Sequence, residues 1–414
     1  MSVAEATPAI EVRKERRGLL LVILGALSAI GPLSIDMYLP ALPAISGEMM
    51  SAPAQVQLTL TACLIGVSVG QVLAGPLSDV RGRRGPLLVG VGGFALASLL
   101  CAFAPNVPAL IALRLLQGVL GGAALVIVRA VVRDLYDGAA IARIFATLML
   151  VSGLAPILAP IAGAQLLAFT SWRGVFVALS LLGLALLLAV IPGVKETLPA
   201  DQRESGGLRH TAMTFWRLLR DRAFMASALT AGLAFAAMFA YISGSPFVLQ
   251  GVYQATPQQY SLIFGLNALG LTVMAQVGGR LAGRVRPALL VRVGLVVTLA
   301  GGVLLVAAAT AGQGPGGLGG LGGLGGIVAG LFVIMCGQGL VLPGTGALAL
   351  ASQPPQVAGS ASALLGVLQF ALGAVAAPLV GLAGSGTAVP MASVMLGLIL
   401  ASGVAFTLLR RGVR

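Results

Sequence analysis

Acidic residues, histidine and cysteine are all scarce in this chain. Only 12 of its 414 residues are Asp or Glu, none of these lies beyond Asp221, and His210 is the single histidine. The three cysteines lie in apolar runs, which argues against a disulfide framework and against a His/Cys metal site. Without metal ligands, and without a nucleophile beside a base, the sequence argues against an enzyme and implies no bound cofactor.

Charged residues of either sign make up 9% of the chain, whereas 58% of the residues are hydrophobic. The mean hydropathy of +1.02 leaves too little polar surface to cover a soluble globule. A bilayer crossing needs about 20 apolar residues, and about twelve such segments can be placed. We therefore predict an all-α membrane protein with twelve transmembrane helices in two pseudo-symmetric six-helix bundles. The expected spans are 18–40, 54–76, 86–104, 108–131, 140–168, 172–193, 223–247, 257–280, 288–311, 326–350, 356–380 and 388–409.

The basic residues fall in alternate loops between these spans. Arg81, Arg83 and Arg84 follow the second span, whereas Arg173 is the single basic residue in a loop on the opposite side. The positive-inside rule then places both termini in the cytoplasm, with an N-terminal segment at 1–17 and a tail at 410–414. The net charge of +13 would also suit nucleic-acid binding, but the basic residues are not gathered on one surface, and topology explains them better.

The longest polar stretch separates two halves of similar pattern. Residues 194–222 end in an amphipathic segment around Trp216, which is typical of an interfacial linker. This predicts an N-terminal bundle at 18–193 and a C-terminal bundle at 223–409. The loop that begins at Gly75 resembles the loop that begins at Gly279, which indicates homologous halves. Gly283 stands where the first copy has Asp79, so the halves differ chemically.

Asp36 is the one carboxylate inside any of the long apolar runs. A carboxylate at membrane depth costs several kcal/mol unless it is paired, neutralised or hydrated, so such a residue is a functional candidate. We interpret Asp36 as a site that binds and releases a proton, the coupling ion. The alternative is that it lies near the end of its helix and is solvated by lipid headgroups.

The loop after the second span combines helix-breaking glycines with a basic cluster. In so short a loop, Asp79 can cap a helix or pair with an arginine and so favour one packing of the helices. We predict a conformational latch here, with the inner end of the fourth span contributing to it. The alternative, membrane topology by itself, would explain the arginines but not Asp79 or the glycines. The predicted latch residues are Gly75, Asp79, Gly82, Arg83, Arg84, Arg133 and Asp134.

This loop resembles the signature loop of the major facilitator superfamily, and its place between spans two and three agrees. The segments 34–43, 114–118, 132–136 and 243–247 further resemble the Bcr/CflA drug-resistance branch of that superfamily. The resemblance covers nearly the whole chain. It implies a multi-pass transporter of the bacterial inner membrane that acts as a monomer and exports phenicol-like or bicyclomycin-like drugs in exchange for protons.

The resemblance also implies roles for two further spans. Arg114 in span four is implied to act with Asp36 in proton coupling, although a structural charge that stabilises the contact between helices is an equal alternative. Span five resembles the proline-rich and glycine-rich motif of antiporters through Gly153, Pro156, Pro160 and Gly163. Prolines in such a helix free backbone carbonyls, and small neighbours allow close helix contact.

Aromatic and neutral polar side chains within the spans are candidates for a drug pocket. They are Met37, Tyr38, Gln117, Phe239, Tyr241, Asn267 and Gln338. Tyr38 has the strongest case because it neighbours Asp36. The alternative functions are export or proton symport of a small metabolite, and a membrane sensor, although no output domain is attached.

Two glycine patterns are expected to have no chemical role. Gly66-Val-Ser68-Val-Gly70 matches the elbow of serine hydrolases, but it lies inside a span without a strand, so helix packing is the better interpretation. Residues 312–326 repeat Gly-Gly-Leu without the lysine of a phosphate loop and are interpreted as a flexible connector.

Overall fold

The computed structural model describes residues 14–136, 139–203, 208–312, 323–354, 357–382, 384 and 386–411, and these are almost entirely helical. The N-terminal residues 1–13, most of the glycine-rich tract (313–322) and residues 412–414 lie outside the described residues. The first elements are α1 (Lys14–Asp36), η1 (Leu39–Ala41), α2 (Leu42–Glu48), α3 (Pro53–Arg81), α4 (Arg84–Ala102), α5 (Val107–Leu135), α6 (Ala139–Phe169) and α7 (Trp172–Gly193). They are followed by η2 (Ala200–Gln202), α8 (Leu208–Arg220), α9 (Arg222–Pro246), the π-helical η3 (Phe247–Val252), α10 (Pro257–Leu281), α11 (Pro287–Ala311), α12 (Leu324–Ala351), α13 (Ala358–Leu382) and α14 (Val389–Arg411).

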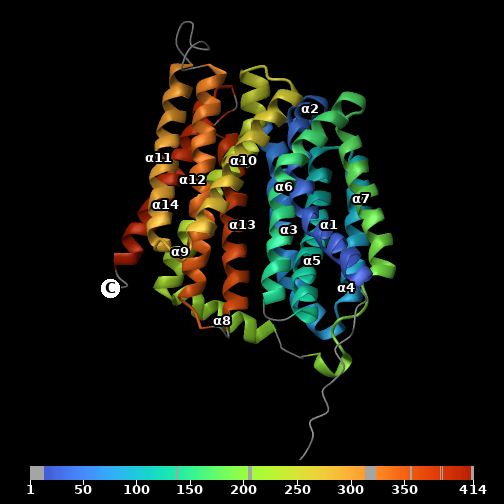
Figure 1. Cartoon of the computed structure of the whole chain (residues 1–414). Helices are drawn as coiled ribbons and strands as arrows, with labels where there is room; N and C mark the ends of the chain where they lie inside the picture. The colour runs from blue at the N-terminus through green and yellow to red at the C-terminus, as the bar shows by residue number, and fades with distance from the viewer. Residues whose placement is uncertain are drawn as a thin grey trace, which may run out of the picture.

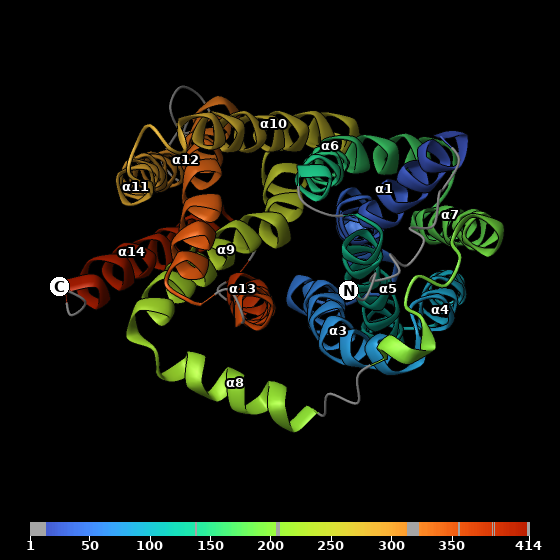
Figure 2. The same cartoon turned by 60° about the horizontal axis from the view of Figure 1, so that its bottom comes forward.

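Twelve of these helices are long and apolar enough to cross a membrane, as predicted. A helix pairs its backbone groups within itself, which is what a segment surrounded by lipid requires. The N half consists of α1 to α7 and the C half of α9 to α14, and α8 lies crosswise below them (Figures 1 and 2). The predicted fold class is therefore confirmed.

The two ends of the bundle differ in charge. We call the end that carries Arg83, Arg84 and α8 the basic end, and the opposite end, which carries Glu48 and Trp172, the far end (Figure 1). At the basic end the chain reverses direction after α3 and after α10, each time at a glycine with positive φ, +88° at Gly82 and +90° at Gly283. The repeat seen in the sequence thus has a structural counterpart. In the sequence alignment of the two loops, however, Gly283 stands opposite Asp79 and not opposite Gly82.

Glycines allow α3 and α5 to lie backbone to backbone. A Cβ atom at Gly66 would lie 2.3 Å from the carbonyl oxygen of Leu115, and one at Gly70 would lie 2.0 Å from that of Val119. Gly118 on α5 meets the backbone of α3 in the same way. The pattern around Ser68 therefore serves helix packing, as predicted.

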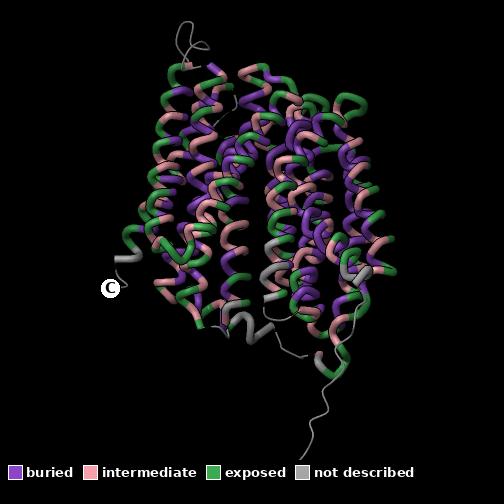
Figure 3. Tube along the Cα trace, viewed as in Figure 1, coloured by how far each residue is buried: buried purple, intermediate pink, exposed green. Residues whose placement is uncertain are grey.

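The buried apolar side chains form a shared cluster at the far end and separate clusters at the basic end. The far-end cluster joins residues of both halves, among them Leu39 and Trp172 with Phe239 and Met391. Nearer the basic end, one cluster belongs to the N half and another to the C half and α8. Buried residues run along the helices of both halves (Figure 3). The halves are thus packed together at the far end and have separate cores at the basic end.

The first span differs from its prediction at the far end. The sequence predicts one helix to residue 40, but α1 ends at Asp36 and the chain continues through η1 and α2 to Glu48. Pro40 explains the break, because it has no N–H to donate to the carbonyl of Asp36 and its ring would clash with that carbonyl. Asp36 therefore lies where the regular helix ends.

Candidate functional site

Asp36 is buried at the break in the first span, with 5% of its surface exposed. Within the described residues it forms no hydrogen bond and no ion pair. It lies close enough to Tyr241 and Tyr260 of the C half to interact with them electrostatically. The candidate proton site is thus an unpaired acid at the interface between the halves.

The antiporter-like helix packs directly beside this site. A Cβ atom at Gly163 would lie 2.0 Å from the carbonyl oxygen of Met37, so only glycine allows α6 to approach the chain next to Asp36. Farther along the same helix, Gly153 faces Thr272 of α10 in the other half. Pro156 and Pro160 lie inside α6, which remains continuous. The structure therefore brings this predicted motif to both Asp36 and the C half.

Arg114 is completely buried, but it does not pair with Asp36 in the described structure. Its Nη1 donates to the carbonyl of Ser34 at 2.9 Å and to Oε1 of Gln117 at 2.5 Å. The guanidinium carbon lies 4.9 Å from the ring centre of Tyr38. Nε and Nη2 of Arg114 have no hydrogen-bond partner among the described residues. The guanidinium is thus surrounded by neutral groups, and two of its N–H groups remain available as hydrogen-bond donors.

Tyr38 and Gln117, both predicted to contact substrate, are buried inside the N half. The Tyr38 hydroxyl lies 3.0 Å from Oγ1 of Thr59, and its ring contacts Phe176 with 5.1 Å between ring centres. Gln117 donates to Oγ of Ser98 at 2.7 Å and accepts from Arg114. In this conformation both side chains support the environment of Arg114.

Tyr241 and Asn267 form the polar centre of the C half. Nδ2 of Asn267 donates to the Tyr241 hydroxyl at 2.9 Å, and the Tyr241 ring stacks on Phe264 with 5.4 Å between centres. Oδ1 of Asn267 is buried without a partner among the described residues. A buried acceptor left unpaired costs about 1–3 kcal/mol, so this atom is a candidate to accept a hydrogen bond from substrate or water.

Gln338 and Phe239 lie elsewhere in the C half. Nε2 of Gln338 donates to the carbonyl of Ala234 at 2.9 Å, and the side chain borders a small void with Thr298 and Ser402. Phe239 stacks on Phe235 with 6.0 Å between ring centres. Asn267 and Tyr241 are thus bonded to each other, and Tyr241 lies within electrostatic reach of Asp36, whereas Gln338 lies within the core of the C half.

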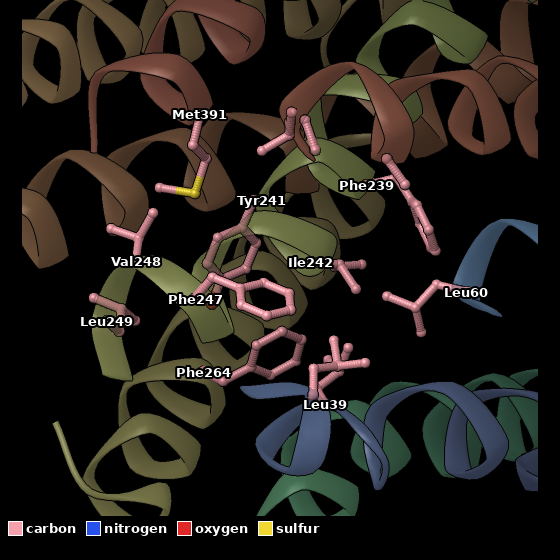
Figure 4. Packing of buried hydrophobic residues seen from close by; sticks show 14 of the residues in the cluster. Leu39, Leu60, Phe239, Tyr241, Ile242, Phe247, Val248, Leu249, Phe264 and Met391 are labelled. Carbon is pink, nitrogen blue, oxygen red and sulfur yellow. The ribbon is translucent and has the colours of Figure 1, made fainter. Parts of the chain in front are cut away.

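The segment after Asp36 closes the far end between the halves. Leu39 of η1 faces Tyr241, Phe247 and Phe264, with which it shares one buried cluster (Figure 4). Nε2 of Gln250, in the π-helix η3, donates to the carbonyl of Pro40 at 3.3 Å. The first span of each half is therefore broken near the far end, and the two broken segments touch.

The N half holds the other end of this segment. Nε1 of Trp172 donates to Oε2 of Glu48 at 2.7 Å, and Arg173 forms an ion pair with the same carboxylate. The guanidinium of Arg173 also lies 4.3 Å from the Trp172 ring centre. These contacts hold α2 against the start of α7, so η1 and α2 belong mechanically to the N half.

Neutral side chains make the hydrogen bonds that join the halves. Among the described residues these bonds all lie toward the far end, and each runs from a side chain to a backbone carbonyl. They are Gln57 to Ser243 at 3.0 Å, Thr61 to Ala374 at 3.0 Å, Gln250 to Pro40 and Gln258 to Ala164 at 3.2 Å. A bond of this kind contributes about 0.5–1.5 kcal/mol, so together they can be broken during a conformational change.

A charge cluster occupies the basic end of the N half. Arg83 pairs with Asp79 at 2.5 Å and with Asp134 at 2.9 Å, and it also donates to Oγ of Ser78 at 2.8 Å. Gly75 lies inside α3, while Gly82 ends the helix with its positive φ. Arg84 donates to the carbonyl of Ile191 at 2.9 Å. Arg133, also predicted here, is exposed and has no ion pair among the described residues.

Glu196 completes this cluster, and the sequence analysis did not single it out. Its carboxylate accepts hydrogen bonds from the backbone N–H groups of Arg83 at 2.7 Å and Arg84 at 3.2 Å, at the start of α4. Partial burial opposes ionisation, but these bonds and those from Thr197 and Leu198 hold the pKa of Glu196 below its ordinary value. A glutamate just after a span, on the same side as a helix N-terminus, is the signal that could have identified it.

Comparisons with known proteins identify the family. Residues 16–378 match the Major Facilitator Superfamily. The chain is 40% identical to the "Uncharacterized MFS-type transporter YdgK" of Bacillus subtilis over 395 residues, 95% of each chain. It is 30% identical to the "Bicyclomycin resistance protein homolog" of Haemophilus influenzae, covering 93% of this chain and 94% of that protein. The "Multidrug resistance protein MdtL" of Escherichia coli is 28% identical over 68% of this chain and 71% of its own length.

A solved structure supports the fold independently. A bacterial homologue of the human lysosomal transporter Spinster, in an inward-facing and unoccupied conformation, superposes with a TM-score of 0.76. The identity is 14%, and the match covers 97% of this chain and 98% of that one. The twelve spans, the family match and the two nearly full-length relatives together show that this chain is a multi-pass bacterial membrane transporter of the major facilitator superfamily, of the drug-resistance type that the sequence motifs resemble.

Proposed function

We propose that this transporter exports small amphipathic drugs from the cytoplasm in exchange for protons. The observation that carries the proposal is Asp36, a buried and unpaired carboxylate at the break in the first span. An unpaired charge in such a place is costly, and binding a proton removes that cost. An acid at the interface between two halves that separate and rejoin meets a different environment in each conformation.

The distribution of charge supports an orientation. Arg83 and Arg84 lie at the basic end, which the positive-inside rule assigns to the cytoplasm of a bacterial inner membrane. Both termini then lie in the cytoplasm, and the far end faces outward. The far end is closed by the contacts of Leu39, so this conformation is closed to the outside.

The proposed cycle uses the residues of the interface. With the far end open, Asp36 binds a proton from outside and drug leaves. The halves then close around Leu39 and separate at the basic end, where Asp36 releases its proton to the cytoplasm and drug binds. Arg114 supplies a fixed positive charge in the N half, and its free donors can attract the Asp36 carboxylate when the helices shift.

The substrate class rests on the relatives and on the C half. Proteins named for bicyclomycin and multidrug resistance are related to this chain over most of its length. The stacked rings of Tyr241 and Phe264 offer an apolar surface, and Oδ1 of Asn267 offers a hydrogen-bond acceptor. The resemblance to the Bcr/CflA branch implies phenicol-like and bicyclomycin-like molecules, so we name them as the substrates to test.

Purified protein in liposomes tests this proposal. Drug efflux is measured under an imposed pH gradient for wild type, for Asp36→Asn, and for Asp201→Asn as an isosteric change at an exposed linker acid. Wild type and Asp201→Asn should transport drug in response to the gradient, whereas Asp36→Asn should bind drug but lose the response. Gradient-driven transport by Asp36→Asn would exclude it as the proton carrier. Movement of drug in the same direction as protons would identify a symporter.

A further inference from the structure

The helix α8 joins the two halves but crosses neither of them. It lies across the basic end of the C half (Figure 2), and a single residue, Asp221, separates its last residue from the first residue of the span α9. Leu218 is buried in a cluster with Phe224 and other residues of the C half. One face of α8 is therefore fixed to the protein, and its junction with α9 holds the helix at the basic end of that span.

The other faces of α8 are exposed and divide into an apolar and a basic side. Trp216 and Leu219, three residues apart, share one side and are 57% and 40% exposed. Arg217 and Arg220 are exposed on the adjacent side. The guanidinium of Arg220 lies 4.6 Å from the ring centre of Trp216 and so joins the two sides. An exposed apolar side next to a basic side is the arrangement of a helix that lies in a membrane interface.

The C half contains no acid to balance these arginines. No Asp or Glu follows Asp221 in the sequence. The Asp221 carboxylate is itself occupied, because it accepts from the N–H groups of Ala223 and Phe224 and from Nε2 of Gln353 at 2.8 Å. Within the described residues, Arg217, Arg220 and Arg222 form no ion pair. Their counter-charge must therefore come from outside the C half.

We propose that α8 binds the headgroups of anionic phospholipids through Arg217, Arg220 and the neighbouring Arg222, with Trp216 and Leu219 inserted into the interface. Insertion of the apolar side sets how deep α8 lies in the membrane interface, and the basic side selects anionic headgroups. Each basic residue near an anionic membrane surface strengthens binding by about five-fold. Because Leu218 ties α8 to the core of the C half, bound lipid would also fix the position of the linker between the halves.

Fluorescence quenching tests this in the full-length protein, which contains only two tryptophans. The variant Trp172→Phe leaves Trp216 as the single tryptophan, and Trp216→Phe leaves the buried Trp172 as the matched control. Each is reconstituted in phosphatidylcholine vesicles that contain equal fractions of brominated phosphatidylglycerol or brominated phosphatidylcholine. The fluorescence of Trp216 should be quenched more strongly by the anionic lipid, and that of Trp172 should show no preference.

A second variant separates headgroup binding from simple insertion. Arg217→Gln with Arg222→Gln, made in the Trp172→Phe background, keeps the Arg220 stack on Trp216. This double variant should lower the preference for the anionic lipid by at least about ten-fold. Higher ionic strength should lower the same preference when α8 keeps its arginines. Equal quenching of Trp216 by both lipids would overturn the proposal and leave an unselective anchor. No quenching by either lipid would overturn it as well and place α8 away from the bilayer.

Discussion

Gly163 of α6 lies against the backbone carbonyl of Met37, the residue that follows Asp36. An added Cβ atom would come within 2.0 Å of that carbonyl oxygen. Any change at position 163 therefore acts on the segment that carries the proposed proton site, without removing a polar group.

We expect Gly163→Ala to lower the transport rate by about ten-fold or more, because overpacking of this kind costs about 1–3 kcal/mol. The measurement is drug efflux from proteoliposomes, with protein amount and thermal unfolding checked in parallel. Gly397→Ala in α14 is the control, since an added Cβ atom there would meet nothing within 4 Å. Equal efflux by both variants would contradict the role of the close contact.

Leu39→Ala should weaken the closure of the far end. Truncating a buried leucine costs about 2–5 kcal/mol, and here the loss falls on contacts between the halves. We expect the outward-open population to increase by at least about ten-fold, measured as the distance between spin labels placed on α2 and α10. Leu39→Met, which keeps the volume, should resemble wild type. An unchanged distance distribution in Leu39→Ala would mean that η1 does not hold the halves together.

The basic-end cluster predicts an order of effects. The Asp134 side chain is 15% exposed and that of Asp79 is 50% exposed, while both bind Arg83. We therefore expect Asp134→Asn to reduce turnover more than Asp79→Asn, because exposed ion pairs contribute only about 0–1 kcal/mol. Both variants should keep their drug affinity. A large loss of affinity with normal turnover would contradict the latch.

Glu196 gives a pH dependence with a defined sign. Its pKa is lowered in the folded protein from the ordinary 4.5, so its stabilising effect is present above pH 4.5 and is lost as the pH falls through the lower, folded value. The backbone amides of Arg83 and Arg84 should be protected from hydrogen exchange at neutral pH and lose protection in acid, after correction for intrinsic rates. Glu196→Gln should be less protected at neutral pH and change little in acid. Identical behaviour of wild type and variant would exclude this role for the carboxylate.

Shortening the tract at 312–326 by a few residues, before α12 begins at Leu324, should leave transport near wild type, because the sequence there offers no charged group. Efflux assays and thermal unfolding measure this together. Loss of transport by a stably folded deletion would show that the connector has a function.

The fold could be predicted from the sequence because long apolar runs and alternating basic loops leave few other solutions. Asp36 and Gly163 also stood out, the first by its charge in an apolar run and the second by its motif. Their proximity did not, because the packing of α6 against the break after α1 depends on three-dimensional contacts. The break itself has a local cause, Pro40, which the length of the apolar run concealed.

Other parts of the site depend on contacts between distant segments. Asn267 was chosen as a polar residue, but its bond to Tyr241 and its unpaired oxygen follow from how α9 and α10 pack. Tyr38 stays a candidate for contact with substrate, but the sequence could not show that its hydroxyl and ring contact Thr59 and Phe176. Glu196 was hidden in a linker, because only the fold brings it to the start of α4.

The isolation of Asp36 has an electrical consequence. If Asp36 is the one group in the apolar runs that carries protons, each cycle brings in one proton. The fixed charge of Arg114 would move with the N half in both directions and so would add no net charge. Exchange of a neutral drug would then transfer one net positive charge, so that a membrane potential drives it by about 2.3 kcal/mol per 100 mV. Exchange of a singly charged cationic drug would transfer none and would respond to the pH gradient alone.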